Sequence, residues 1–231
     1  MGSSQSQSAQ LLEKRVVIIG GGYGGMAAAL KLQGKCKLTL IDPKEAFHHC
    51  IAALRACTED GFARKTLIPY APALGEDFKR GMVEAIDTDA KKVKLAGGEE
   101  VSYDFLIIAT GSQGQFPCNV TGGEDTSVYI KQYTDILQKL KASTDIVVVG
   151  GGACGVEMAG EIVTDFKDKK VRECPIFQNF PETGHRGVPS RLTRGGKLKL
   201  IWSLSVLDCP ATPWPMLLHW VAARRRAVAS R

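Results

Sequence analysis

The sequence predicts an α/β protein built on doubly wound parallel sheets, with two dinucleotide-binding folds of which the second is incomplete. The unit that predicts this class occurs twice: a short apolar run, a glycine-rich turn, and a stretch with apolar residues at helical spacing. The two copies begin near Val16 and Asp145, about 130 residues apart. A chain of 231 residues is long enough to bury one large core or two small ones.

The first copy opens the domain that we expect over residues 13–112. Val16–Ile19 is apolar throughout, which is typical of a strand buried on both faces of a parallel sheet. A helix follows over Met26–Leu32, and a second strand over Lys37–Asp42 stops at Pro43.

The rest of this domain has weaker patterns. Residues 47–58 are compatible with a short helix or a structured loop. Strand-like pieces over 82–87, 92–95 and 100–103 are separated by Asp and Gly turns and predict a small antiparallel meander. Residues 105–111 then predict another buried strand that ends in glycine.

The second copy begins after a connection rich in Ser, Gly and Pro over 113–126. An amphipathic helix is predicted over 127–140, followed by a strand over Asp145–Val149 and a helix from Val156 to about residue 166. We therefore expect an incomplete second domain over 127–171.

The first glycine turn reads Gly20-x-Gly22-x-x-Gly25 between a strand and a helix. The glycines allow a tight turn, close approach of a pyrophosphate to the backbone, and packing of the helix on the strand. Asp42 follows Gly20 by 22 residues, near the spacing of about 20 at which a carboxylate binds ribose hydroxyls. A glycine turn without any ligand is the alternative interpretation.

The second turn repeats the pattern as Gly150-x-Gly152-x-x-Gly155. Two such folds in one chain predict two nucleotides with hydride transfer between them. Here the acidic partner is missing, because a count of 22 residues from Gly150 reaches Arg172, and Pro175 interrupts the strand. The ribose-binding half of the second site is therefore not recognisable.

The net charge of +6 is confined to the end of the chain. Residues 1–170 carry 20 Lys and Arg against 21 Asp and Glu, whereas residues 171–231 carry 10 against 3. The basic segment has neither the interleaved aromatic residues nor a fold that would present it to nucleic acid, which argues against nucleic-acid binding. No stretch approaches the roughly 20 apolar residues of a membrane span.

Cysteine and histidine patterns give little support for a dithiol or a metal site. The seven cysteines contain no C-x-x-C or C-x-x-x-x-C spacing, so we do not expect a redox-active dithiol. His48-His49-Cys50 suggests a metal, but the remaining histidines, His185 and His219, lie in the irregular final segment. We therefore expect no metal.

The N-terminus matches a lipidation pattern. Met1–Ser6 has a glycine at position 2 and a serine at position 6, as N-myristoylation of Gly2 requires. An unmodified polar arm over residues 1–12 is the alternative. One acyl chain gives marginal, reversible membrane binding, which suits an enzyme whose substrate lies in a lipid surface.

Several further motifs resemble the apoptosis-inducing-factor-like branch of the flavoprotein oxidoreductases that have two Rossmann-like dinucleotide-binding domains. The resemblance covers about residues 2–171. It implies FAD in the first fold, NAD(P)H in the second, and hydride transfer through the flavin to a lipophilic, ubiquinone-type quinone. The motifs are Phe47-His48-His49-x-x-Ala52-Ala53-Leu54-Arg55, Gly61-Phe62-Ala63, Ala109-Thr110-Gly111 and Gly155-Val156-Glu157-Met158-Ala159.

The resemblance also implies individual roles. It places Glu157 near the nicotinamide and His48 near the flavin, although a hydrogen-bonded loop histidine is an equal interpretation of His48. It implies a cytoplasmic protein, peripheral on membranes or lipid droplets or associated with mitochondria, and linked to cell-death control. The cofactor site would comprise Gly20, Gly21, Gly22, Tyr23, Gly24, Gly25, Asp42, Arg55, Val83, Thr110 and Gly111 for FAD, with Gly150, Gly152 and Gly155 for NAD(P)H.

After about residue 171 the chain departs from the family pattern. We expect residues 172–231 to be an unrelated, poorly ordered tail, with a basic stretch over 214–226 that is either membrane-touching or accidental. Loss of the rest of the second fold leaves two hypotheses open. The chain is either an oxidoreductase by type with weak FAD binding, or a non-catalytic remnant that binds a membrane or a partner.

Overall fold

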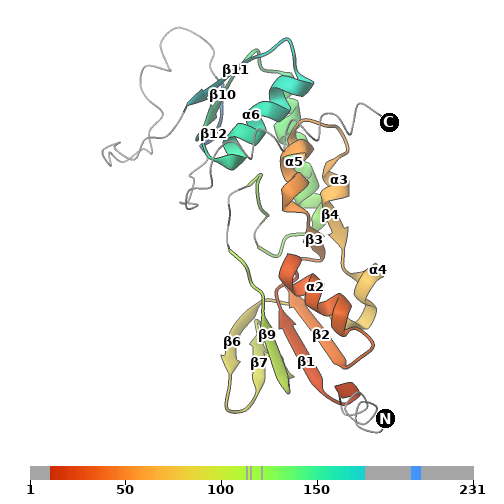
Figure 1. The fold of residues 1–231 in the computed structure, drawn as a ribbon. Coiled ribbons are helices and arrows are strands. Elements are labelled where there is room, and N and C mark those ends of the chain that lie inside the picture. Colours follow the sequence, from red (N-terminus) through yellow and green to blue (C-terminus); the bar gives the residue numbers. More distant parts are fainter. Residues whose placement is uncertain (1–10, 113, 115, 121, 175–198, 204–231) are drawn as a thin grey trace, which may run out of the picture.

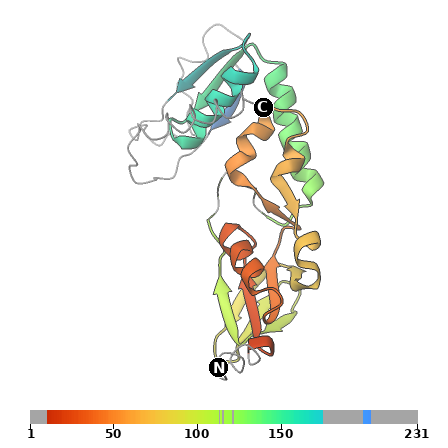
Figure 2. The same cartoon turned by 45° about the vertical axis from the view of Figure 1, so that its right-hand side comes forward.

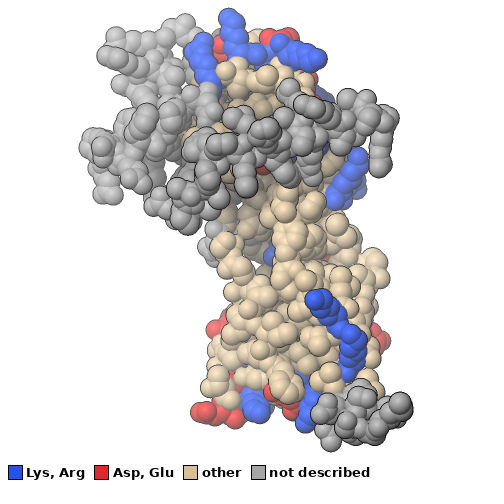
Figure 3. Space-filling model, viewed as in Figure 1, with Lys and Arg blue, Asp and Glu red and all other residues tan. Residues whose placement is uncertain are grey.

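The computed structural model describes residues 11–112, 114, 116–120, 122–174 and 199–203, with backbone alone at 173–174 and 199–203. Figures 1 and 2 show these residues as an elongated arrangement, with one parallel sheet at each end and a helical layer between them. The space-filling view narrows between the two ends (Figure 3). The α/β class and the parallel sheets expected from the sequence are confirmed.

The first sheet holds four parallel strands in the order β5-β2-β1-β9. The helix α2 (Tyr23–Leu32) begins earlier than predicted, because the last glycines of the turn are already helical. The final strand is shorter than predicted and ends at Ile108. The strands are β1 (Arg15–Ile19), β2 (Lys37–Asp42), β5 (Phe78–Arg80) and β9 (Phe105–Ile108).

Both faces of this sheet are covered, as its apolar strands require. On one face Ile18 and Leu40 pack with Ala29 of α2 and with Tyr70. The other face packs on the antiparallel meander that the sequence predicted, in the order β6-β7-β8. The meander consists of β6 (Val83–Asp87), β7 (Lys92–Leu95) and β8 (Glu100–Ser102).

The middle layer consists of short elements and one long helix. Residues 47–58, which the sequence left open, contain the end of a strand and a 3-10 helix. The strands β3 and β4 pair antiparallel, so that His48 lies opposite Leu67. The elements are β3 (Ala46–His48), η1 (Cys50–Cys57), α3 (Ala63–Thr66), β4 (Leu67–Pro69), α4 (Ala71–Leu74), η2 (Gly75–Asp77) and α5 (Thr126–Lys141).

The second sheet has the parallel order β11-β10-β12. Its helix α6 packs with α5 and η1 around a shared core that includes Leu54, Tyr133 and Met158. The elements are β10 (Asp145–Val149), α6 (Ala153–Asp165), β11 (Lys170–Cys174) and β12 (Lys199–Ser203).

Two of these strands reach into the segment that we expected to be a poorly ordered tail. Strand β11 continues past residue 171 because Val171 packs against the shared core, and β12 lies on the other edge of β10. The domain limits themselves stay a prediction. None of the helices in the described part of the chain has the length and apolar composition that crossing a bilayer requires.

Candidate functional site

The first glycine turn lies between the end of β1 and the start of α2. Gly20 has φ +99°, and a side chain there would collide with the carbonyl of Ala109. A side chain at Gly25 would collide with the carbonyl of Gly20. By contrast, a Cβ at Gly22 would meet no atom within 4 Å, and this residue caps α2 without a side-chain hydrogen bond. The backbone N–H groups at this helix end are therefore approachable by an anionic group, which is the fit that a pyrophosphate needs.

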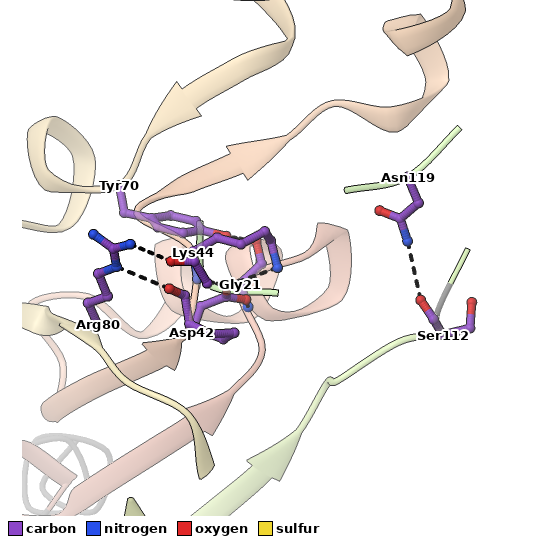
Figure 4. Close-up of polar contacts among 9 residues, drawn as sticks. Gly21, Asp42, Lys44, Tyr70, Arg80, Ser112 and Asn119 are labelled. Carbon is purple, nitrogen blue, oxygen red and sulfur yellow. Dashed lines mark hydrogen bonds and ion pairs between the residues drawn. The ribbon is translucent and has the colours of Figure 1, made fainter. Parts of the chain in front are cut away.

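Asp42 fixes the turn from the end of β2. It is buried, and its Oδ2 accepts the N–H of Gly21 at 2.7 Å. Its Oδ1 accepts the N–H of Lys44 at 2.8 Å and pairs with Nζ of Lys44 at 2.9 Å (Figure 4). The carboxylate expected to bind ribose thus also holds the turn in place.

Tyr70 and Arg80 support the same region (Figure 4). The hydroxyl of Tyr70 donates to the carbonyl of Gly21 at 2.8 Å. Burial, together with the charge of Asp42, raises the pKa of this hydroxyl, so it remains a donor. Arg80 donates to the carbonyls of Pro43 at 3.1 Å and Gly123 at 2.6 Å, and thereby ties the segment before α5 to the first sheet.

Tyr23 connects the first turn of α2 to the middle layer. Its hydroxyl is 2.7 Å from Nδ1 of His49, the residue that caps η1. Its ring also contacts Phe47 edge to face, with ring centroids 4.9 Å apart. Tyr23, which the sequence analysis places in the cofactor site, therefore also links the glycine turn to η1.

His48 is buried in a hydrogen-bonded chain. Its Nε2 is 3.1 Å from the hydroxyl of Tyr133, which donates to the carbonyl of Pro117 at 2.8 Å. Because that hydroxyl has one hydrogen, Nε2 of His48 is the donor to it. Nδ1 is left as a buried acceptor with no hydrogen-bond partner in the described structure. Burial lowers the pKa of His48 to about 4. The flavin-proximal role of His48 stays a prediction.

This burial predicts an acid-sensitive stability. Between pH 6.5, the ordinary pKa, and about pH 4, the unfolded chain binds the proton that folded His48 excludes. The free energy of unfolding is therefore expected to fall by about 3 kcal/mol as the pH drops across this window. Urea titrations at pH 7 and pH 4.5 measure the loss. If a His48→Asn variant loses as much unfolding free energy between pH 7 and pH 4.5 as the wild type, the acid sensitivity does not come from His48.

The other FAD residues implied by resemblance have separate surroundings. Thr110 touches the glycine turn, since its Cα lies 3.0 Å from a Cβ built at Gly20. Val83 begins β6 and packs on the meander core, and Gly111 is exposed with φ +67°. Arg55 instead faces α6, with Nη2 3.2 Å from Oε2 of Glu161. The cofactor roles of these residues stay predictions.

The second glycine turn repeats the geometry of the first. Gly150 has φ +117°, Gly152 caps α6 in an extended conformation, and a side chain at Gly155 would collide with the carbonyl of Gly150. Glu157, predicted near the nicotinamide, lies half-buried one turn into α6. The residues present therefore fit the start of a second dinucleotide site.

The strand register shows which residue of the second sheet occupies the position that Asp42 has in the first. Ile41 pairs with Ile19, and Asp42 comes next in the chain. In the second sheet Cys174 pairs with Val149. The residue that follows Cys174 is Pro175, which lies outside the described residues and brings no carboxylate.

Arg172, which the count of 22 residues reached, does not occupy the position equivalent to Asp42. It pairs with Val147 inside β11, and its Nη2 is 3.6 Å from Oδ1 of Asp145. The count is misleading because the second unit needs more residues than the first between its glycine turn and the end of its next strand.

Comparison with known proteins agrees with this geometry. The family model for pyridine nucleotide-disulphide oxidoreductases matches residues 14–193. The chain belongs to this family. Among curated relatives, ferroptosis suppressor protein 1 of Taeniopygia guttata is 47% identical over 158 residues, which are 68% of this chain and 42% of that protein. The human protein of that name is 45% identical over 172 residues, which are 74% and 46%.

More distant members extend the comparison. Apoptosis-inducing factor homolog B of Dictyostelium discoideum is 36% identical over 159 residues, which are 68% of this chain and 41% of that protein. The sulfide:quinone oxidoreductase of Aquifex aeolicus is 27% identical with a TM-score of 0.53, over 68% of this chain and 42% of that one. FAD and NAD(P)H, the cofactors expected from the sequence, are those of this oxidoreductase family. The chain spans less than half the length of these relatives.

Sequence reasoning missed several residues of the site. Lys44, Tyr70 and Tyr133 come from segments with no glycine motif, and the partners of Tyr70 and Tyr133 are distant in the chain. Within the described residues, no three metal-ligating side chains come together.

Proposed function

We propose that this chain carries the FAD-binding part and the start of the NAD(P)H-binding part of an oxidoreductase that passes hydride to a lipophilic, ubiquinone-type quinone. The observation that carries the proposal is the pair of glycine turns with the same backbone contact, at Gly25 and at Gly155. The similarity to ferroptosis suppressor protein 1, and to an oxidoreductase named for sulfide and quinone, supports the quinone as acceptor. By the same similarity, the reaction would protect membranes from lipid peroxidation.

The chain's own residues would hold the two nucleotides. The open N-terminus of α2 binds the pyrophosphate of FAD, and Asp42 binds the adenosine ribose from the neighbouring strand end. The N-terminus of α6 binds the second pyrophosphate, with Glu157 close to the nicotinamide. Nδ1 of His48 offers a buried acceptor to a group that carries a proton. When bound, FAD supplies the two-electron carrier between NAD(P)H and the quinone.

The N-terminal pattern supports a location at a lipid surface. A myristoyl group on Gly2 would hold the protein reversibly on a membrane or lipid droplet, where a lipophilic quinone dissolves. Gly2 lies outside the described residues. Flotation with vesicles after expression with an N-myristoyltransferase is expected to recover the wild type and to leave Gly2→Ala in solution.

The activity is tested with the purified full chain. Because the chain spans less than half of its relatives, we expect FAD to bind weakly and to be lost on gel filtration. NADH- or NADPH-dependent reduction of a soluble quinone is expected only with added FAD, above the rate of free FAD alone. No rate above that background, with full-length ferroptosis suppressor protein 1 active in the same assay, would contradict the proposal. That outcome would favour the alternative of a myristoylated, non-catalytic protein that binds a membrane or a partner.

A further inference from the structure

The carboxylate of Asp42 has little acceptor capacity left for a ligand. Its two oxygens offer about four acceptor positions in all. Oδ2 accepts the N–H of Gly21 at 2.7 Å. Oδ1 accepts the N–H of Lys44 at 2.8 Å and is 2.9 Å from Nζ of the same lysine. A single position, on Oδ2, therefore remains for a ribose, which brings two neighbouring hydroxyls.

Lys44 covers this carboxylate. Only 4% of the Asp42 side chain is exposed, against 21% of the Lys44 side chain. Figure 4 shows the Lys44 side chain next to Asp42 and Gly21. A Cβ at Gly22, the next residue of the glycine turn, would meet no atom within 4 Å. A ligand on this open side of the turn therefore meets the ammonium group of Lys44 as well as the carboxylate.

The backbone around Lys44 holds this ammonium group in place. The N–H of Lys44 donates to Asp42, and the carbonyl of Pro43 accepts Nε of Arg80 at 3.1 Å. Ala46, two residues after Lys44, begins β3 and pairs with Pro69. A lysine ammonium has three N–H donors, of which the described structure uses one, on Oδ1 of Asp42. The ion pair therefore orders the lysine stem and leaves donors for a ligand.

We propose that Lys44 is a second ribose-binding residue of the first nucleotide site. One ribose hydroxyl donates to the free position on Oδ2 of Asp42, and the neighbouring hydroxyl accepts an N–H of Lys44. The ribose thus meets one acceptor and one donor, instead of the two acceptors that an unpaired carboxylate offers. The ion pair has no net charge, which matches the uncharged ribose of FAD. This assignment rests on the proposed function, which places FAD in this site.

Fluorescence titration of the full chain tests the two hydroxyls one at a time. The ligands are FAD and its analogues that carry 2′-deoxyadenosine or 3′-deoxyadenosine in place of adenosine, so all three have the same charge. Because each hydroxyl has its own partner, each analogue is expected to bind at least about threefold more weakly than FAD. An analogue that binds as tightly as FAD would overturn the proposal, since one hydroxyl would then have no partner.

The variant Lys44→Met removes the donor and keeps a long side chain over Asp42. It is expected to weaken FAD binding about fivefold more than it weakens the analogue that lacks the hydroxyl bound by Lys44. The other analogue should be weakened as much as FAD. If Lys44 acts only by attracting the pyrophosphate, all three ligands lose affinity equally, which would contradict the assignment. Tighter binding of FAD to the variant would also contradict it, because Lys44 would then compete with the ribose for Asp42.

Lys37→Met is the matched control, at the opposite end of β2 from Asp42. The Lys37 side chain is 60% exposed and pairs with the exposed Glu13 at 2.6 Å. All three ligands should bind this variant as they bind the wild type.

Urea unfolding shows whether Lys44→Met is folded, and if it is not, the two analogues on the wild type still decide the outcome. FAD binding that depends on neither adenosine hydroxyl would overturn the role of Lys44 alone. A chain that binds no FAD at all would overturn the proposed function together with it.

Discussion

Replacement of Gly25 by alanine is expected to destabilise the chain by about 3 kcal/mol. The added methyl group would collide with the backbone carbonyl of Gly20, and neither partner is a flexible side chain that could move aside. Relief requires α2 to shift away from β1, which disturbs a core that contains Ile18 and Ala29. The same shift displaces the helix end that is proposed to hold the pyrophosphate. FAD binding should therefore be lost together with stability.

Urea unfolding and an FAD fluorescence titration measure the two effects. Gly160→Ala is the matched control, because Gly160 is an exposed helical glycine on α6 and a Cβ there meets no atom within 4 Å. The control is expected to gain about 0.5–1 kcal/mol from the helix preference of alanine and to bind FAD normally. If Gly25→Ala unfolds at the same urea concentration as the wild type, Gly25 does not pack against the carbonyl of Gly20 as closely as the structure shows.

The sequence was most informative where the structure is local. A buried parallel strand, a glycine turn and a helix follow one another within about 20 residues, and each has its own pattern. Both such units were therefore predicted, as was the meander. The short elements between 63 and 80 were not, because four-residue helices and three-residue strands are too short to show periodicity.

The site was harder to predict, because its contacts join distant segments. Tyr70 reaches Gly21 across 49 residues, and His48 reaches Tyr133 across 85. Which residues become partners depends on how the strands and helices pack in the fold, and the spacing of residues in the sequence does not reveal that packing.

Replacement of Asp42 is expected to have the second large effect. In Asp42→Ala, the buried N–H of Gly21 loses its acceptor at 2.7 Å, and Nζ of Lys44 loses its counter-charge at 2.9 Å. Hydrogen bonds to a charged group contribute about 1.5–3 kcal/mol each, so a loss of about 3 kcal/mol in the free energy of unfolding is expected. FAD affinity should fall at least about tenfold, since the ribose partner and the anchor of the glycine turn are removed together.

The variant Asp42→Asn separates the contribution of the hydrogen bond to Gly21 from that of the negative charge. Asp42→Asn keeps the side-chain shape and one acceptor oxygen, so the turn can retain its contact with Gly21 while the charge facing Lys44 is lost. It should therefore lose less stability than Asp42→Ala but still bind FAD poorly, because an amide oxygen accepts ribose hydroxyls more weakly than a carboxylate. Asp168→Asn is the control, since Asp168 is 82% exposed and its ion pair with Lys169 is 3.9 Å long; its stability should stay within about 0.5 kcal/mol of the wild type. Equal unfolding free energies for Asp42→Ala and Asp168→Asn would show that Asp42 does not hold the turn.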